Sequence, residues 1–156
     1  MRTILSATLG GFLVAGCGSA PTGPPFQPVA DVRQLMAEII EPAADVVWNA
    51  VGTIIDRDEG TNEWSPQTDA EWMVVQNGAL TIAEGGNLLM IGDRARDQDL
   101  WMSMAQGMID AGMLAYEAAK ARDKEAVFAI GETVYRSCDS CHNLYWVDDD
   151  NEDPGR

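Results

Sequence analysis

The segment that decides the fold covers residues 123–146 and reads DKEAVFAIGETVYRSCDSCHNLYW. Its apolar positions recur at helical spacing, at Ala126, Ile130, Val134 and Cys141. This periodicity predicts a helix with one inward face. Near its end, Cys138, Cys141 and His142 stand at positions i, i+3 and i+4, so a helix places all three on one face.

Two cysteines separated by two residues, with histidine directly after the second, are the attachment motif of a c-type haem. On one helical face, both thiols can form thioether bonds to the vinyl groups, and His142 can reach the iron as the proximal ligand. The alternatives are a chance pairing, a disulfide redox motif and half a zinc site. A redox pair usually opens a helix after a strand, whereas Cys138 stands late in its segment, and zinc needs four ligands. We therefore expect one covalent haem c on Cys138, Cys141 and His142, the single histidine of the chain.

The composition indicates a globular and strongly acidic protein. The chain has 156 residues, 46% of them apolar, which is enough for one domain with a core. Acidic residues outnumber basic ones 25 to 10, for a net charge of −15. This balance argues against nucleic-acid binding. It allows steering toward a basic redox partner, and the alternative is a merely solvated surface.

The N-terminal residues predict export and lipidation. Arg2 precedes an apolar run, Ile4 to Val14, that has signal-peptide length and is too short to span a bilayer. The run leads into Leu-Val-Ala-Gly-Cys17, which resembles a bacterial lipobox. We expect residues 1–16 to be a signal peptide and Cys17 to be acylated. The alternative is an ordinary signal, with Cys17 lost or left free.

Residues 17–30 contain four prolines among small and polar residues, which predicts an extended tether behind the lipid anchor. Resemblance to Gram-negative lipoproteins implies a periplasmic, membrane-anchored protein. Gly18 stands where an aspartate would favour the inner membrane, so the outer membrane is slightly favoured. Haem attachment outside the bacterial cytoplasm agrees with this location.

Residues 31–147 predict an all-α domain. Apolar stripes indicate helices over about 31–55, 98–121 and 123–146, with a kink or break at Pro42 and a loop over 57–68. A further helix, capped by Thr68 or Asp69, carries an apolar face from Trp72 to Leu89. Gly85 and Gly86 predict a close helix crossing or an early helix end. No stretch alternates long enough to predict a strand, and residues 148–156 form an acidic tail expected to be disordered.

The layout from residue 31 to 146, with the cysteine–histidine motif in the last helix, resembles the cytochrome c prime family and its methionine-ligated relatives. Tyr145, three residues after His142, matches the CHxxY ending common in that family. The resemblance implies an antiparallel four-helix bundle, with the haem inside it against the C-terminal helix. It also implies that Arg33 contacts a haem propionate and that a homodimer is possible. Trp146 replaces the basic residue that many members carry there, which questions any gas binding that depends on that cation.

The sixth iron position decides between two functions. With a single histidine, the candidates are a methionine, Lys120, Lys124, water or an empty position. Met36 is the best methionine, because relatives use one early in the first helix, although a plain core role is the alternative. We expect a non-enzymatic electron carrier. The alternative is a five-coordinate haem protein that binds nitric oxide or another small gas. A peroxidase is disfavoured, because no distal histidine exists.

Overall fold

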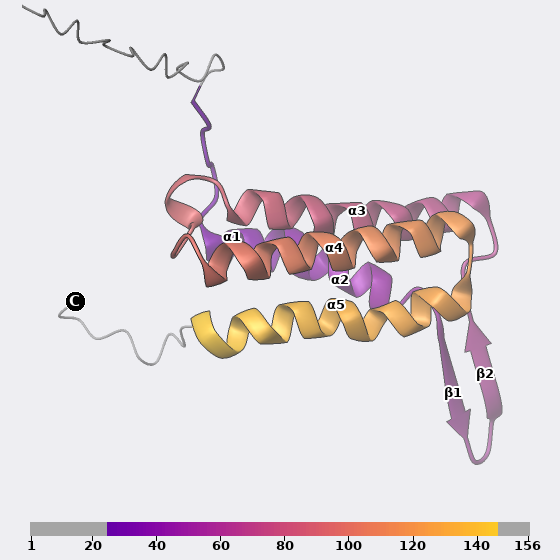
Figure 1. Ribbon diagram of the computed structural model, residues 1–156. Helices are drawn as coiled ribbons and strands as arrows, with labels where there is room; N and C mark the ends of the chain where they lie inside the picture. The colour runs from indigo at the N-terminus through magenta and orange to yellow at the C-terminus, as the bar shows by residue number, and fades with distance from the viewer. Residues whose placement is uncertain (1–24, 147–156) are drawn as a thin grey trace, which may run out of the picture.

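The computed structural model describes residues 25–146, and Figure 1 shows a mostly helical molecule with one small two-stranded sheet. Within these residues the helical segments lie along one another, and a hairpin projects from one end of them. The prediction of a mainly helical chain is confirmed. The signal peptide, the lipidation site Cys17 and the acidic tail from Asp148 fall outside the described residues.

The first helical segment contains a π-turn in front of Pro42. α1 (Val32–Leu35) begins after the N-cap Asp31 and runs into the π-helical turn η1 (Met36–Ile40). α2 (Glu41–Trp48) completes the segment, with the proline in its first turn. Proline has no N–H to donate, so the hydrogen-bond pattern can change beside it at little cost. The kink or break expected at Pro42 is thus a one-turn π insertion directly before it.

Two predictions for the following residues are wrong. The sequence analysis extended the first helix to residue 55 and assigned a loop to 57–68, with no strand. The structure instead ends the helix at Trp48 and forms an antiparallel hairpin of β1 (Gly52–Asp56) and β2 (Gly60–Trp64). Figure 1 shows the hairpin standing clear of the helices.

Local chemistry explains the hairpin. The side chain of Asp56 accepts the amides of Asp58 at 2.7 Å and Glu59 at 3.0 Å, which closes the turn. Gly60 follows at φ +82°, a conformation that favours glycine. At the base, the indole N–H of Trp64 donates to the carbonyl of Asn49 at 3.0 Å. The turn and its base therefore fix the hairpin without an apolar face to bury.

α3 (Asp69–Leu89) begins as the sequence predicts. The hydroxyl of Thr68 accepts the amide of Glu71 at 3.2 Å, and the carboxylate of Glu71 accepts the amide of Thr68 at 2.9 Å. This reciprocal capping box satisfies two of the helix's free N–H groups. The second predicted helix is confirmed, and of the two caps considered the structure uses Thr68.

α3 crosses α4 (Leu100–Ala121) at very short range. A Cβ added to Gly112 would lie 2.6 Å from the backbone nitrogen of Ala83, and one added to Gly86 would meet the backbone of α4 equally closely. Only glycine allows two helix backbones to approach this far. The close crossing expected at Gly86 is therefore present, and the helix continues through it to Leu89.

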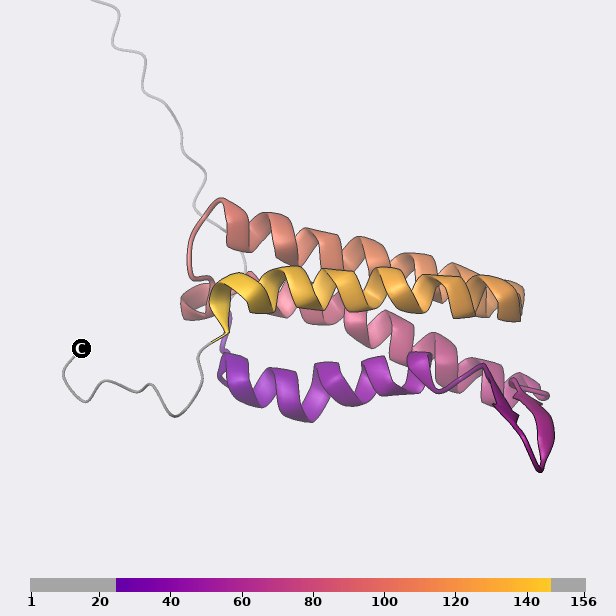
Figure 2. The same ribbon diagram turned by 90° about the horizontal axis from the view of Figure 1, so that it is seen from below.

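α5 (Lys124–Tyr145) returns antiparallel to α4 after a left-handed residue, Arg122, at φ 56°. The side chain of Asp123 caps it by accepting the amide of Ala126 at 2.9 Å. Figure 2 shows α5 between α4 and the α1–α2 segment. The last two predicted helices are confirmed to within two residues at each end.

One end of the molecule gathers the start of α1, the end of α3, the start of α4 and the end of α5 (Figure 1). The short 3-10 turn η2 (Gly92–Arg94) lies there. The buried guanidinium of Arg94 donates to the carbonyl of Ala30 at 2.7 and 3.0 Å and to that of Leu88 at 3.1 Å. These bonds join the chain entering α1 to the end of α3.

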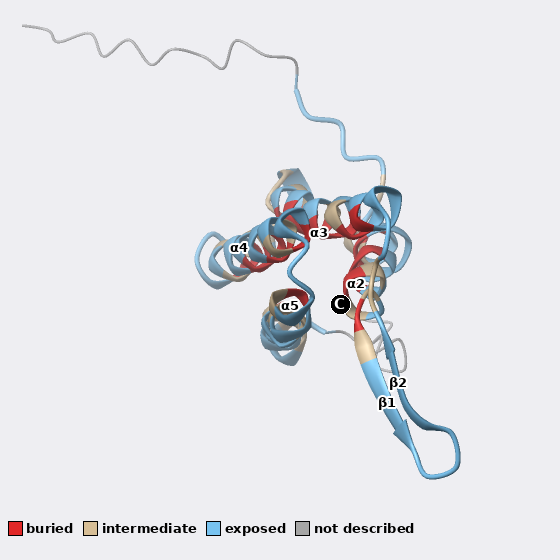
Figure 3. Ribbon diagram, turned by 90° about the vertical axis from the view of Figure 1, so that its right-hand side faces the viewer, coloured by how far each residue is buried: buried red, intermediate tan, exposed pale blue. Residues whose placement is uncertain are grey.

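Buried side chains line the inner faces of α2, α3 and α4 (Figure 3). α5 contributes less, since Val127 and Val134 are its fully buried residues. Among the helices of residues 25–146, none combines the length and the hydrophobicity needed to cross a bilayer. The core is therefore built mainly by three helical segments, with α5 laid against it.

Candidate haem site

Cys138, Cys141 and His142 continue the inward face of α5. All three side chains are half-buried, whereas the residues between and directly after them are exposed. They extend the line of the buried Val127 and Val134 along the same helix. The spacing in the sequence therefore places both thiols and the imidazole on one face, the face turned toward the other helices.

Burial raises the pKa of both thiols above the ordinary cysteine value. For Cys138 the main cause is removal from water, slightly offset by a hydrogen bond with Ser137. For Cys141 burial is again the first cause, and the charge of Cys138 adds to it. Redox-active CxxC thiols show the opposite shift, because they lie at a helix N-terminus. Here the pair stands in the second half of α5, as the sequence predicted.

His142 packs edge-on against Trp146, with ring centroids 4.7 Å apart and an interplanar angle of 65°. The amide of Trp146 donates to the carbonyl of His142 at 3.0 Å and forms the last hydrogen bond of the helix. Trp146 itself is 62% exposed. The histidine is thus in the final turn of α5, covered on one side by an indole that solvent also reaches.

Tyr145 ties this final turn to the start of α4. Its ring meets Trp101 edge to face, with centroids 5.0 Å apart, and its hydroxyl donates to the carboxylate of Asp97. The sequence analysis identified Tyr145 and missed Asp97. No local pattern marks that residue, since it lies 48 positions earlier in the chain.

Met36 stands at the first position of the π-turn and is half-buried at the edge of the main core cluster. Helical spacing would put Met36 on one stripe with Ile40, Ala43 and Val47. Those three residues are buried, and Met36 is half-buried against the same core cluster. A π-turn inserts one residue, so Leu35, five positions before Ile40, occupies the core position and is 1% exposed. Met36 is therefore beside the core rather than within it.

The other predicted residues, Arg33, Lys120 and Lys124, lie at two opposite ends of the molecule. Arg33 is in α1, at the same end of the molecule as the last turn of α5, and its side chain is exposed. Lys120 and Lys124 lie at the opposite end of the helices, where they pair with Glu117 at 3.6 Å and with Glu63 at 3.9 Å. The structure therefore separates both lysines from His142.

An aromatic pair joins α2 and α5 farther along the inward face. The indole of Trp48 donates to the carbonyl of Gly131 at 3.0 Å, and its ring lies 6.5 Å from that of Tyr135. Tyr135 precedes Cys138 by less than one helical turn. Aromatic side chains from two helices thus border the cysteine-bearing stretch.

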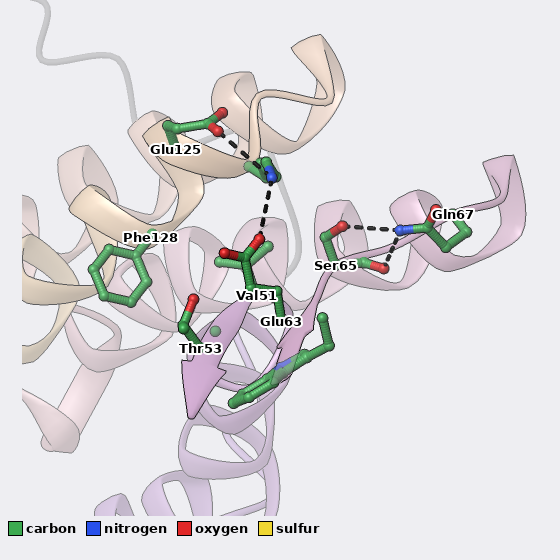
Figure 4. Close-up of a pocket in the computed structure, with 10 residues that line it drawn as sticks. Val51, Thr53, Glu63, Ser65, Gln67, Glu125 and Phe128 are labelled. Atoms are coloured by element: carbon green, nitrogen blue, oxygen red, sulfur yellow. Dashed lines mark hydrogen bonds and ion pairs between the residues drawn. The ribbon is translucent and has the colours of Figure 1, made fainter. Parts of the chain in front are cut away.

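The pocket of about 420 Å³ drawn in Figure 4 lies elsewhere, between the hairpin and the start of α5. Its lining includes Val51, Thr53, Glu63, Lys124 and Phe128 and none of the predicted haem residues. Within residues 25–146, no three His, Cys, Asp or Glu side chains group in a way that could hold a metal ion.

The donor set fits a covalently attached haem. Two uncharged, half-buried thiols share a face with an imidazole one residue beyond the second, which is the arrangement that two thioether bonds and one axial nitrogen require. Searches against models of known protein families, curated protein sequences and solved structures found no match to this chain.

Proposed function

We propose that this chain is a membrane-tethered, periplasmic c-type cytochrome that carries electrons through one covalent haem. In this proposal the helices form an antiparallel four-helix bundle of the cytochrome c prime type. The observation that carries it is the common inward face of Cys138, Cys141 and His142 near the end of α5. A chance CxxCH would be free to point into solvent.

In this proposal Cys138 and Cys141 would hold the haem by thioether bonds, and His142 would supply the proximal ligand to its iron. When bound, haem supplies a one-electron couple whose potential depends on axial ligand, burial and local charge. The Trp101–Tyr145 contact, in which Trp101 is 3% exposed, covers the end of the site nearest the start of α4.

Met36 is the proposed sixth ligand. The π-turn begins at Met36, which is half-buried at the edge of the core cluster, and Leu35 fills the core position beside it. π-turns occur often at functional sites, and a side chain that the core does not need can serve the iron. A thioether favours ferrous iron and so raises the potential.

The proposed location rests on the N-terminal sequence, and the proposed partner rests on the charge of the chain. The lipobox-like sequence before Cys17 supplies the anchor, and several acyl chains hold stably, at about 0.8 kcal/mol per buried CH₂. The acidic surface, with a net charge of −15, suits a redox partner with a basic docking face.

Retention of haem after denaturation tests the central proposal. The protein is expressed with a haem-attachment system and extracted with acidic acetone. Wild type should keep its haem in the protein pellet, and the Cys138→Ala/Cys141→Ala variant should release whatever it binds. Extraction of haem from wild type with both cysteines intact would refute covalent attachment.

The variant Met36→Ala then decides between the two functions. If Met36 is a ligand, the ferric spectrum changes from low-spin to largely high-spin, the potential falls, and the ferrous protein binds nitric oxide. Truncating a fully buried methionine costs about 2–5 kcal/mol, and Met36 is half-buried, so the fold should survive. A variant spectrum equal to that of wild type would remove Met36 from the iron, and gas binding at an open position would become the better function. Met104→Ala, on α4, is the control.

A further inference from the structure

The carboxylate of Asp97 joins two helix ends. One oxygen, Oδ1, accepts the amide of Asp99 at 2.9 Å and that of Trp101 at 3.0 Å, so it caps the start of α4. The other, Oδ2, accepts the hydroxyl of Tyr145 from the last turn of α5. A single side chain therefore fixes the beginning of one helix and the end of another.

The ring of Tyr145 is held by the same framework. Trp101, its edge-to-face neighbour at 5.0 Å, is 3% exposed, and its indole N–H donates to the carbonyl of Leu89 at 2.8 Å. This bond holds Trp101, which belongs to α4, against the end of α3. The ring of Tyr145 packs on this fixed indole, and its hydroxyl donates to a carboxylate that two backbone amides orient.

This contact stands one turn from the proposed proximal ligand. Tyr145 follows His142 by three residues, so the two lie on neighbouring positions of one helix face. The final turn of a helix lacks onward hydrogen bonds and frays unless something holds it. In α5 the last backbone bond runs from Trp146 to the carbonyl of His142.

We infer that Asp97 is a positioning residue for His142, acting through the hydroxyl of Tyr145. This inference rests on the proposed haem site. The hydrogen bond to a carboxylate keeps the last turn of α5 wound, and this fixes the direction in which the imidazole of His142 projects. Because Asp97 also caps α4, the orientation of the ligand is tied to the packing of α4 against α3.

Tyr145→Phe is the cleanest perturbation, since it removes the hydroxyl and leaves the ring on Trp101. Asp97→Asn is the complementary one, because an amide oxygen can still cap α4 while the amide NH₂ can only donate to the tyrosine oxygen, which replaces the charged hydrogen bond by a weaker neutral one. Tyr116→Phe, on α4, is the matched control. All three are made in the full protein with its haem attached.

Both test variants should keep covalent haem but show a larger high-spin fraction in the ferric spectrum and a shifted reduction potential. The amide of Trp146 should exchange with deuterium about tenfold faster or more. The double variant should show no larger effect than Tyr145→Phe alone, because both changes act on the same bond and Tyr145→Phe already removes it. Tyr116→Phe should match wild type in all three measurements.

The outcomes separate this inference from the proposed function. If wild type carries covalent haem and Tyr145→Phe matches Tyr116→Phe in spectrum, potential and exchange, the positioning role is refuted while the cytochrome proposal stands. If wild type holds no covalent haem, the proposed function itself fails. A change in exchange with no change in spectrum or potential reduces Asp97 to a structural residue and also overturns the inference.

Discussion

The crossing of α3 and α4 can be tested with two glycines of one helix. Replacing Gly112 by alanine puts a Cβ 2.6 Å from the nitrogen of Ala83 and 2.9 Å from the carbonyl oxygen of Ala79. Both are backbone atoms that move only if the helices separate. Overpacking of this kind costs about 1–3 kcal/mol, offset by about 1 kcal/mol of helix propensity. We expect a net loss of about 0–2 kcal/mol of unfolding free energy.

Gly107 is the internal control, because a Cβ there would meet nothing within 4 Å. Gly107→Ala should therefore show the propensity gain alone and stabilise the protein by about 0.5–1 kcal/mol. Urea unfolding of both variants, followed by far-UV circular dichroism, should move the midpoint in opposite directions. If the two variants shift the midpoint equally, the close approach of the helix backbones is refuted.

Three further predictions concern other parts of the chain. The hydrogen bond to Asp97 raises the pKa of Tyr145 to about 12 and lowers that of Asp97, so its contribution to stability should be constant at neutral pH. That contribution should be lost as pH rises from about 10 toward 12, and again as it falls below about 4. The urea midpoint measured against pH shows both limbs, and the alkaline one should shrink in Tyr145→Phe. Gly52→Ala would place a Cβ 2.1 Å from the ring of Trp64, so the hairpin amides should exchange faster while the helical dichroism stays unchanged. Mass spectrometry of the native N-terminus should find two or three acyl chains on Cys17, and a soluble mature chain starting elsewhere would contradict lipidation.

The helices were predictable because their signals are local. Apolar residues at helical spacing mark α3, α4 and α5, and Thr68 with Glu71 marks a helix start within four residues. The hairpin was missed because its apolar residues do not alternate. Ile54 and Ile55 are adjacent and both exposed, so no period-two pattern exists to detect. The turn chemistry of Asp56 and Gly60 was the available signal.

The candidate site likewise combines a pattern that is local in the sequence with a contact between residues far apart in it. The spacing of Cys138, Cys141 and His142 is a local pattern, because any helix that contains these residues places them on one face. The partner that holds their turn is not local, because Asp97 reaches Tyr145 across 48 positions. Only the packing of α5 beside α4 brings them together, and that packing depends on the whole core.

The π-turn that begins at Met36 changes the surroundings of this side chain from those of a regular helix. A regular helix would give it the same face as Ile40 and make it one more core methionine. The amide of Glu41 bonds to the carbonyl of Met36, five residues back, and this one bond shifts Leu35 into the core instead. Proline at position 42 makes the shift inexpensive, since it has no N–H for the regular pattern to lose. The residue that the sequence marks as a helix breaker thus accompanies a π-turn that puts Leu35 in the core and leaves Met36 half-buried at the edge of the core.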